Sequence, residues 1–188
     1  MEGSIALREW AAAVEALASG RQVIVLRKGG IAEETKEFKV ESPSFYLFPS
    51  YEHQKPHLMK EEARDAVVRT QEEASSHPDT VRIDYYAEVV HDLEVTDEET
   101  LQRLDELHVW TQDYAAERLK WKKTKPLHVL VLRVYELEEP AMLLADESHG
   151  GCKSWLRIPS IHTSAKRPVL PDDKFAAMAE EALRRVRG

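Results

Sequence analysis

The chain has little cysteine, no long apolar run and no excess of basic charge, and each shortage excludes a class of protein. One thiol, Cys152, cannot form an internal disulfide, which fits a reducing compartment. No apolar stretch approaches the roughly 20 residues that a membrane span needs. The acidic start of the sequence is unlike a signal peptide. We therefore expect a cytoplasmic protein with no membrane association.

Basic side chains are outnumbered, because 26 Lys and Arg stand against 34 Asp and Glu, giving a formal net charge of −8. An acidic surface repels nucleic acid and anionic lipid at long range, so binding of a polyanion would require a local basic patch. The composition therefore excludes a bulk DNA-coating protein and leaves room for a small recognition pocket.

The sequence does contain enough apolar material for a core, since 43% of the 188 residues are hydrophobic. Apolar spacing predicts helices over 4–19 and 59–74, within 97–120, and from 172 onward. Alternating or continuous apolar runs predict strands at about 22–27, 38–40, 44–48, 81–91, 127–137, 142–144 and 154–158.

This order of elements indicates an α+β fold in a single domain over 1–188. We expect a mixed, mostly antiparallel sheet that curls into a partly open barrel with flanking helices. Residues 23–26 and 129–132 should lie at its centre, because the second run is apolar on both faces.

The stretch LRKGGI (26–31) places Arg27, Lys28, Gly29 and Gly30 at the end of a predicted strand. Its spacing is not that of a P-loop, which needs G-x-x-x-x-G-K-[ST]. One interpretation is a hairpin turn whose cations lie in water. The other is one wall of an anion-binding cleft, in which the glycines permit close approach of the backbone.

The stretch YEHQKPH (51–57) brings Tyr51, His53 and Gln54 together in a predicted loop. Pro56 stands between His53 and His57 and argues against a helical metal-binding pair. No pair of cysteines supports a zinc site there either. We interpret the segment as a binding loop and expect no obligatory metal or redox cofactor.

The stretch RLKWKKTKP (118–126) gathers cations, including Lys120, around Trp121 in an otherwise acidic protein. Basic groups with an interleaved aromatic ring suit stacking on a base and pairing with phosphate. The alternative is a solvated connection in which Trp121 packs on the core.

The stretch GGCKSW (150–155) places Lys153, Ser154 and Trp155 after the single Cys152. A catalytic thiol there would need a base within hydrogen-bond reach; a small turn residue is the simpler interpretation. Residues 37–39, EFK, match the E-x-K of metal-dependent nucleases. That tripeptide is too common to count without an acidic partner on a neighbouring strand.

Five segments in this order, ALREW, LRKGGI, YEHQKPHL, RLKWKKTKPLHVLVLRVY and GGCKSW, resemble the family of bacterial proteins called domain of unknown function 1802. The resemblance covers nearly the whole chain. It implies a bacterial, cytoplasmic, single-domain protein and supplies no activity.

The segment 20–27 is also similar in spacing to the G-x-K-x-x-E-x-R signature of the ASCH domains, which belong to the PUA-like β-barrels. Gly20 and Arg27 match, whereas Gln22 and Val25 stand in place of the lysine and the glutamate. The resemblance implies a PUA-like barrel, a fold that includes readers of RNA and of modified bases. The two departures count against an ASCH-type hydrolase activity.

We therefore expect a small binding module for a nucleotide or a short single-stranded nucleic acid. One alternative is a small hydrolase or nuclease that uses the Cys152/Ser154 turn or a His/Glu loop, and another is a non-catalytic protein-interaction domain. The candidate ligand-binding residues are Arg27, Lys28, Gly29, Gly30, Tyr51, His53, Gln54, Lys120, Trp121, Lys153, Ser154 and Trp155.

Overall fold

A computed structural model describes residues 3–28, 37–150, 153–162 and 165–188. The strands are β1 (Ser4–Trp10), β2 (Ile24–Arg27), β3 (Ser44–Ser50), β4 (Thr80–Val95), β5 (Leu127–Leu144), β6 (Trp155–Ile158) and β7 (Lys166–Pro168). The α-helices are α1 (Ala11–Ala18), α2 (Glu61–Ser76), α3 (Glu98–Arg103), α4 (Gln112–Lys120) and α5 (Asp172–Arg187). Among these residues, no helix is long and apolar enough to cross a membrane.

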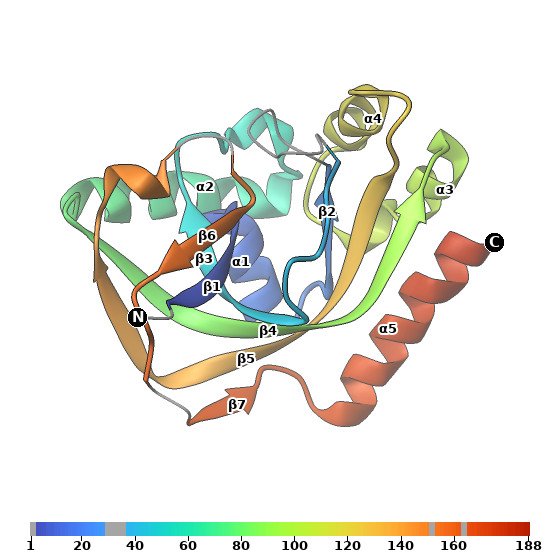
Figure 1. The fold of residues 1–188 in the computed structure, drawn as a ribbon. Helices are drawn as coiled ribbons and strands as arrows, with labels where there is room; N and C mark the ends of the chain where they lie inside the picture. The colour runs from blue at the N-terminus through green and yellow to red at the C-terminus, as the bar shows by residue number, and fades with distance from the viewer. Residues whose placement is uncertain (1–2, 29–36, 151–152, 163–164) are drawn as a thin grey trace.

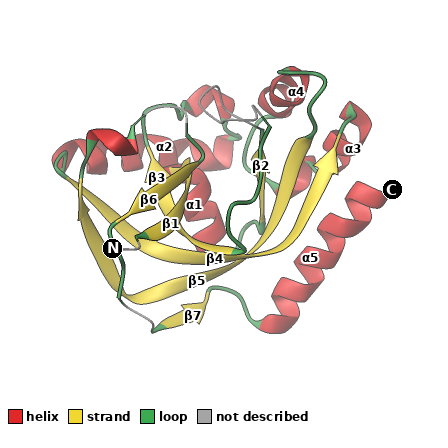
Figure 2. Ribbon diagram, viewed as in Figure 1, coloured by secondary structure: helices red, strands yellow, loops and turns green. Residues whose placement is uncertain are grey.

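The strands form one mixed sheet in the order β2-β5-β4-β3-β1-β6, with β7 paired to β5. β1 and β3 run parallel, and the other described pairs are antiparallel. Figures 1 and 2 show the long strands β4 and β5 bending beneath the shorter ones, with helices around them. The α+β class and the curled, mostly antiparallel, unclosed sheet predicted from the sequence are confirmed.

The long β4–β5 ladder forms the curved base of the sheet, running from Thr80 opposite Leu144 to Val95 opposite Leu127. Its register shifts at two places along β4, between residues 83 and 85 and between 89 and 91. Such irregularities bend a strand and increase its twist. The apolar run 129–132 is fully buried, as its two-faced pattern predicts.

The two ends of the curled sheet meet through side chains. β2 lies at one end of the strand order and β6 at the other, so the prediction that residues 23–26 occupy the centre of the sheet is wrong, although they are buried. Arg27, the last residue of β2, donates to Ser154, the residue before β6, at 2.8 Å. Side-chain contacts therefore join the two ends, and no ladder connects β2 with β6 in the described residues.

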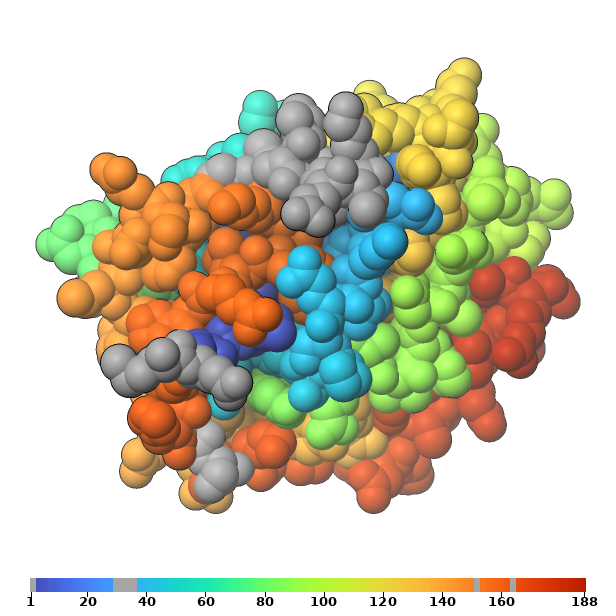
Figure 3. All heavy atoms as spheres, in the orientation of Figure 1, coloured from blue at the N-terminus to red at the C-terminus, as the bar shows by residue number. Residues whose placement is uncertain are grey.

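Phe38 fills the space between those ends and is 1% exposed. Its ring stacks on Trp155 with centroids 5.9 Å apart and lies 5.4 Å from the ring of His128. Residues 38–40 do not form the predicted strand; Trp155 Nε1 instead donates to the Lys39 carbonyl. Figure 3 shows this segment, in light blue, between β6 (orange) and the end of β4 (green).

The predicted helix over 4–19 is correct only from residue 11 onward. Residues 4–10 form β1, which pairs with β3 on one side and β6 on the other. The spacing of Leu7 and Trp10 fits a helix, but Ala6 and Leu7 are both buried between two neighbouring strands. Tertiary pairing therefore overrides the local helical pattern.

Capping residues lie at the ends of α1, α3 and α4. Gly20, just beyond α1, has a φ of 73°, the left-handed conformation that glycine adopts most readily. Thr111 caps α4 by accepting a hydrogen bond from the Tyr114 amide. The Asp97 carboxylate caps α3 by accepting a hydrogen bond from the Thr100 amide.

Candidate functional site

A cleft with a volume of about 380 Å³ opens where β1 and β2 end, next to α4. We call it the Arg27 cleft. It combines basic side chains, aromatic rings and one buried carboxylate. Its lining residues are Arg8, Glu9, Trp10, Leu26, Arg27, Lys28, Ser50, His53, Leu58, Trp110, Tyr114, Arg118, Trp121, Lys153 and Ser154.

Arg27 is held by three partners at the base of the cleft. Its Nη1 donates to the Arg8 carbonyl at 3.0 Å and to Glu9 Oε2 at 3.2 Å. Its Nη2 donates to Ser154 Oγ at 2.8 Å. The guanidinium is thus fixed in one orientation before any ligand arrives, which reduces the entropy that binding would cost.

Glu9 is a buried carboxylate, 3% exposed, at the end of β1. Its Oε1 accepts the Trp10 amide at 2.8 Å. Burial raises the pKa of Glu9, against the opposing influence of the Arg27 cation. The carboxylate therefore balances part of the positive charge that the cleft concentrates.

Lys28 lies in the cleft wall but is 2% exposed, and its ammonium donates to the Leu119 carbonyl at the end of α4. Burial, and secondarily the nearby Arg118 cation, lowers the pKa of Lys28. Lys28 thus ties α4 to β2 and adds positive potential from within the wall, rather than presenting an open ammonium.

Aromatic rings form the apolar part of the lining. Trp10 contacts Trp110 edge-on, with centroids 6.4 Å apart, and Tyr114 at 5.1 Å. Two cations lie over the Trp121 ring: the Arg118 guanidinium is 5.1 Å and the Lys122 ammonium 4.3 Å from the ring centroid. Flat rings beside cations provide the groups needed to hold a base and a phosphate together.

The structure brings about half of the predicted binding residues to this cleft, although they come from four separate stretches of sequence. Those that line it are Arg27, Lys28, His53, Trp121, Lys153 and Ser154. Gly29 and Gly30 lie outside the described residues, and so does Cys152.

Four predicted residues are placed elsewhere. Tyr51 lines a neighbouring cavity, and Lys120 forms an ion pair with Glu98 at 3.0 Å. Trp155 packs against Phe38 and Phe45 in the core. Gln54 is 2% exposed; its amide accepts from the Ala12 amide and donates to Thr70. The side-chain polar atoms of Lys120, Gln54 and Trp155 therefore have partners within the protein.

The sequence did not indicate five residues that line the cleft, namely Arg8, Glu9, Trp10, Trp110 and Tyr114. The first three were assigned to a helix, which hid the fact that they end a strand beside LRKGGI. Trp110 and Tyr114 gave no polar signal and looked like core residues. Assigning ALREW (6–10) to a strand would have indicated that its last residues lie near the cleft.

Ser154 does not have the surroundings of a nucleophile in the described part of the chain. Its Oγ accepts from Arg27, a permanent cation that cannot act as a base. His53 and His57 belong to no described cluster with metal-ligand spacing. The described cluster that has it is Glu37, Glu94 and His128, and His128 stands opposite Arg27 in the β2–β5 ladder.

The fold and the cleft define an α+β chain with an open, curled sheet and a basic, aromatic pocket at its mouth. A family model described as domain of unknown function (DUF1802) matches residues 6–181, so the chain belongs to that family. The chain is also similar to the crystal structure of a serine-to-alanine mutant of ZmASCH from Zymomonas mobilis, with a TM-score of 0.41 and 9% identity over 94% of both chains. No curated protein matches the chain.

Proposed function

We propose that the Arg27 cleft binds a nucleotide or the end of a short single strand of RNA. The observation that carries this proposal is the gathering of Arg27, Lys153 and Trp121 around one cavity in a protein of net charge −8. A cavity that is basic and aromatic in an acidic protein is a local reversal of charge, which is what recognition of a small anion requires.

The charged lining supports binding of phosphate. Arg27 is oriented by Glu9 and Ser154, while Lys153 lines the cleft from an exposed position. The oriented Arg27 guanidinium keeps one Nη2–H beyond its contact with Ser154 and attracts phosphate as a fixed charge, whereas Lys153 contributes a second point charge. The buried Lys28 adds positive potential behind both.

The aromatic lining supports binding of a base. Trp121 and Trp10 are partly exposed within the cleft, so each offers surface to a flat ring. Stacking of a base on such a ring contributes about 1–3 kcal/mol and tolerates any base. A volume of about 380 Å³ is at the small end of ligand pockets, roughly 300–1,000 Å³, and suits one or two nucleotide units rather than a duplex.

Titration of nucleotides and short RNA, followed by tryptophan fluorescence, tests the proposal. We expect Trp121→Ala to weaken binding about 5–150-fold, the equivalent of one lost stacking contact. Lys153→Ala should weaken it less, because an exposed cation is screened by water. Lys120→Ala is the matched control, since that lysine pairs with Glu98 away from the cleft, and it should bind like the wild type.

The proposal fails if the wild type binds none of these ligands at millimolar concentration, or if the Lys120 and Lys153 variants lose affinity equally. Chromatography of the ligand after incubation separates binding from turnover. Products that accumulate with the wild type would identify the chain as a hydrolase and would replace the binding module.

A further inference from the structure

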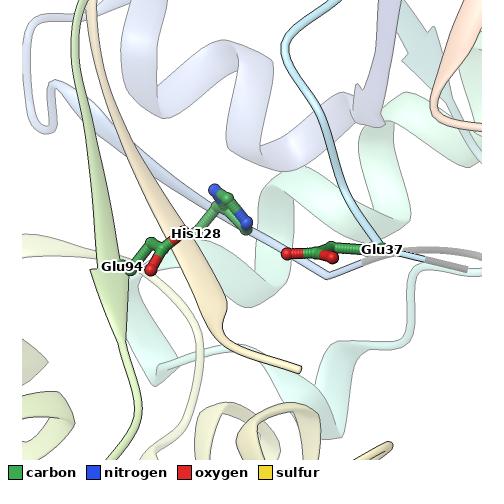
Figure 4. Close-up of side chains that lie close together, drawn as sticks. All are labelled: Glu37, Glu94 and His128. Carbon is green, nitrogen blue, oxygen red and sulfur yellow. The ribbon is translucent and has the colours of Figure 1, made fainter. Parts of the chain in front are cut away.

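Three side chains outside the Arg27 cleft converge on one point of the sheet. Glu37, Glu94 and His128 each offer a ligand atom, and these atoms all lie within 4.8 Å of one another. Figure 4 shows Glu94 beside His128 and Glu37 reaching toward them from the segment that crosses the sheet. The residues come from three separate parts of the chain.

The sheet register places two of them side by side. Glu94 on β4 stands directly opposite His128 on β5, and side chains of opposite residues in an antiparallel pair lie on the same face. Asp92, two residues before Glu94, points to that face as well. Its Oδ1 lies 2.7 Å from His128 Nδ1.

That contact occupies Nδ1 of His128. With Nδ1–H donated to Asp92, Nε2 is the ring nitrogen that remains to bind a metal ion. The residue is 5% exposed, and Nε2 is buried with no hydrogen-bond partner among the described residues. A buried polar atom without a partner is costly, whereas a carboxylate on Nδ1 is the usual support of a histidine that binds metal through Nε2.

The third residue, Glu37, comes from the irregular segment just before Phe38. Glu37 also pairs with Lys125, with Nζ 3.5 Å from Oε2. A bound cation would compete with that lysine for the carboxylate. Both glutamates have flexible side chains, so they can move closer to His128.

We propose that His128 Nε2, Glu94 and Glu37 bind one divalent transition-metal ion, with Zn²⁺ and Mn²⁺ as the fitting candidates. One imidazole with two carboxylates suits these ions better than Mg²⁺ or Ca²⁺, which take oxygen ligands. Ligand atoms at about 2.0–2.2 Å from zinc lie about 3.4 Å from one another, a contraction that the two glutamates can make. Three protein ligands leave a position open to water.

The metal site lies next to the Arg27 cleft and does not depend on it. Phe38 lies between the two, with its ring 5.8 Å from the Arg27 guanidinium and 5.4 Å from the His128 ring. The proposed ion would fasten the segment that carries Glu37 and Phe38 to β4 and β5.

Calorimetric titration of untagged, chelator-stripped protein with ZnCl₂ and with MnCl₂ tests the site. We expect one equivalent to bind. Glu94→Gln should weaken binding by about 100-fold or more, and Asp92→Asn by about 10–100-fold, as for an outer partner of a ligating histidine. Glu94 is exposed, so its variant should keep the fold, which thermal unfolding verifies.

His57→Gln is the matched control, since His57 is an exposed histidine of the 51–57 loop; it should bind like the wild type. His128→Gln should abolish binding, so the visible absorption bands of protein-bound Co²⁺ should be absent in this variant. The site is refuted if neither metal binds saturably, if Glu94→Gln and His57→Gln bind alike, or if His128→Gln keeps full affinity.

Discussion

Arg27 serves the fold and the cleft with the same guanidinium. It is the residue where β2 ends, and its contacts with Glu9 and Ser154 join the two ends of the curled sheet. Removing it would leave Glu9 buried without its cation, which is more damaging than the loss of a surface ion pair. A loss of ligand binding in an Arg27 variant is therefore interpretable only beside a measurement of stability, which is why Trp121 and Lys153 are the better probes of the cleft.

His108 is a buried histidine whose protonation opposes folding. It is 3% exposed, and its Nδ1 accepts the Trp110 amide at 3.2 Å. Burial, followed by the nearby Lys60 cation, lowers the pKa of His108 from its ordinary 6.5 to about 4. Between those two values the unfolded chain binds more protons than the folded one, so this residue makes stability fall as the pH falls from 6.5 toward 4.

We expect His108→Asn to reduce that loss. Asparagine keeps an acceptor for the Trp110 amide and does not titrate. Between pH 7 and pH 4, the free energy of unfolding of the variant should therefore fall by up to about 3 kcal/mol less than that of the wild type. Urea unfolding at four pH values measures the difference. His57→Asn, at an exposed position, should follow the wild type, and parallel curves for all three proteins would contradict the assignment.

At the scale of elements, Gly20 ends α1 in a conformation that other residues resist. Its φ is 73°, and an added Cβ would lie 2.6 Å from Leu170 Cδ2. We expect Gly20→Ala to cost about 1–2 kcal/mol from the backbone alone, plus the displacement of the Leu170 side chain. Urea unfolding measures the cost.

Gly150→Ala provides the comparison for that prediction. Gly150 has a φ of −81°, and its added Cβ would meet the Glu147 carbonyl at 3.2 Å, so the steric conflict is milder and no left-handed penalty applies. If the two variants are equally stable, the left-handed turn does not contribute as argued.

Elements whose local pattern agrees with their tertiary neighbours were predictable. β4, α2 and α5 fall close to their expected positions because alternation and helical spacing leave one consistent choice. β5 begins where expected, but it is one strand that joins the two predicted at 127–137 and 142–144. β1 was not predictable, since the spacing of Leu7 and Trp10 fits a helix and pairing with β3 and β6 decided the outcome. β7 is three exposed residues with no apolar signal.

The two candidate sites also differ in how far the sequence could indicate them. Residues of the Arg27 cleft were found where unusual local composition marked them, as around Arg27 and Trp121. Glu37, Glu94 and His128 stand far apart in the sequence, and each is an ordinary residue of its own segment. Only the β4–β5 register and the crossing segment bring them together, so no spacing in the sequence could have indicated a metal site.

At the scale of the whole molecule, an acidic exterior surrounds a small basic cavity, and this combination limits the ligands that can bind. The net charge of −8 repels a long polyanion outside the cleft, while the binding that we propose for the cleft involves only one or two phosphates. The number of counterions released on binding should therefore be set by the cleft and not by the length of the ligand.

We therefore expect single strands of about five and about fifteen nucleotides to show nearly the same dependence of affinity on salt. With about two phosphates neutralised, log K should fall with log salt at a slope near −1.4. Fluorescence titrations at several salt concentrations measure both slopes, and a duplex of the same length should bind more weakly than the single strand. A slope that steepens in proportion to strand length would mean that phosphates are bound along an extended surface, and the small-cleft model would then be wrong.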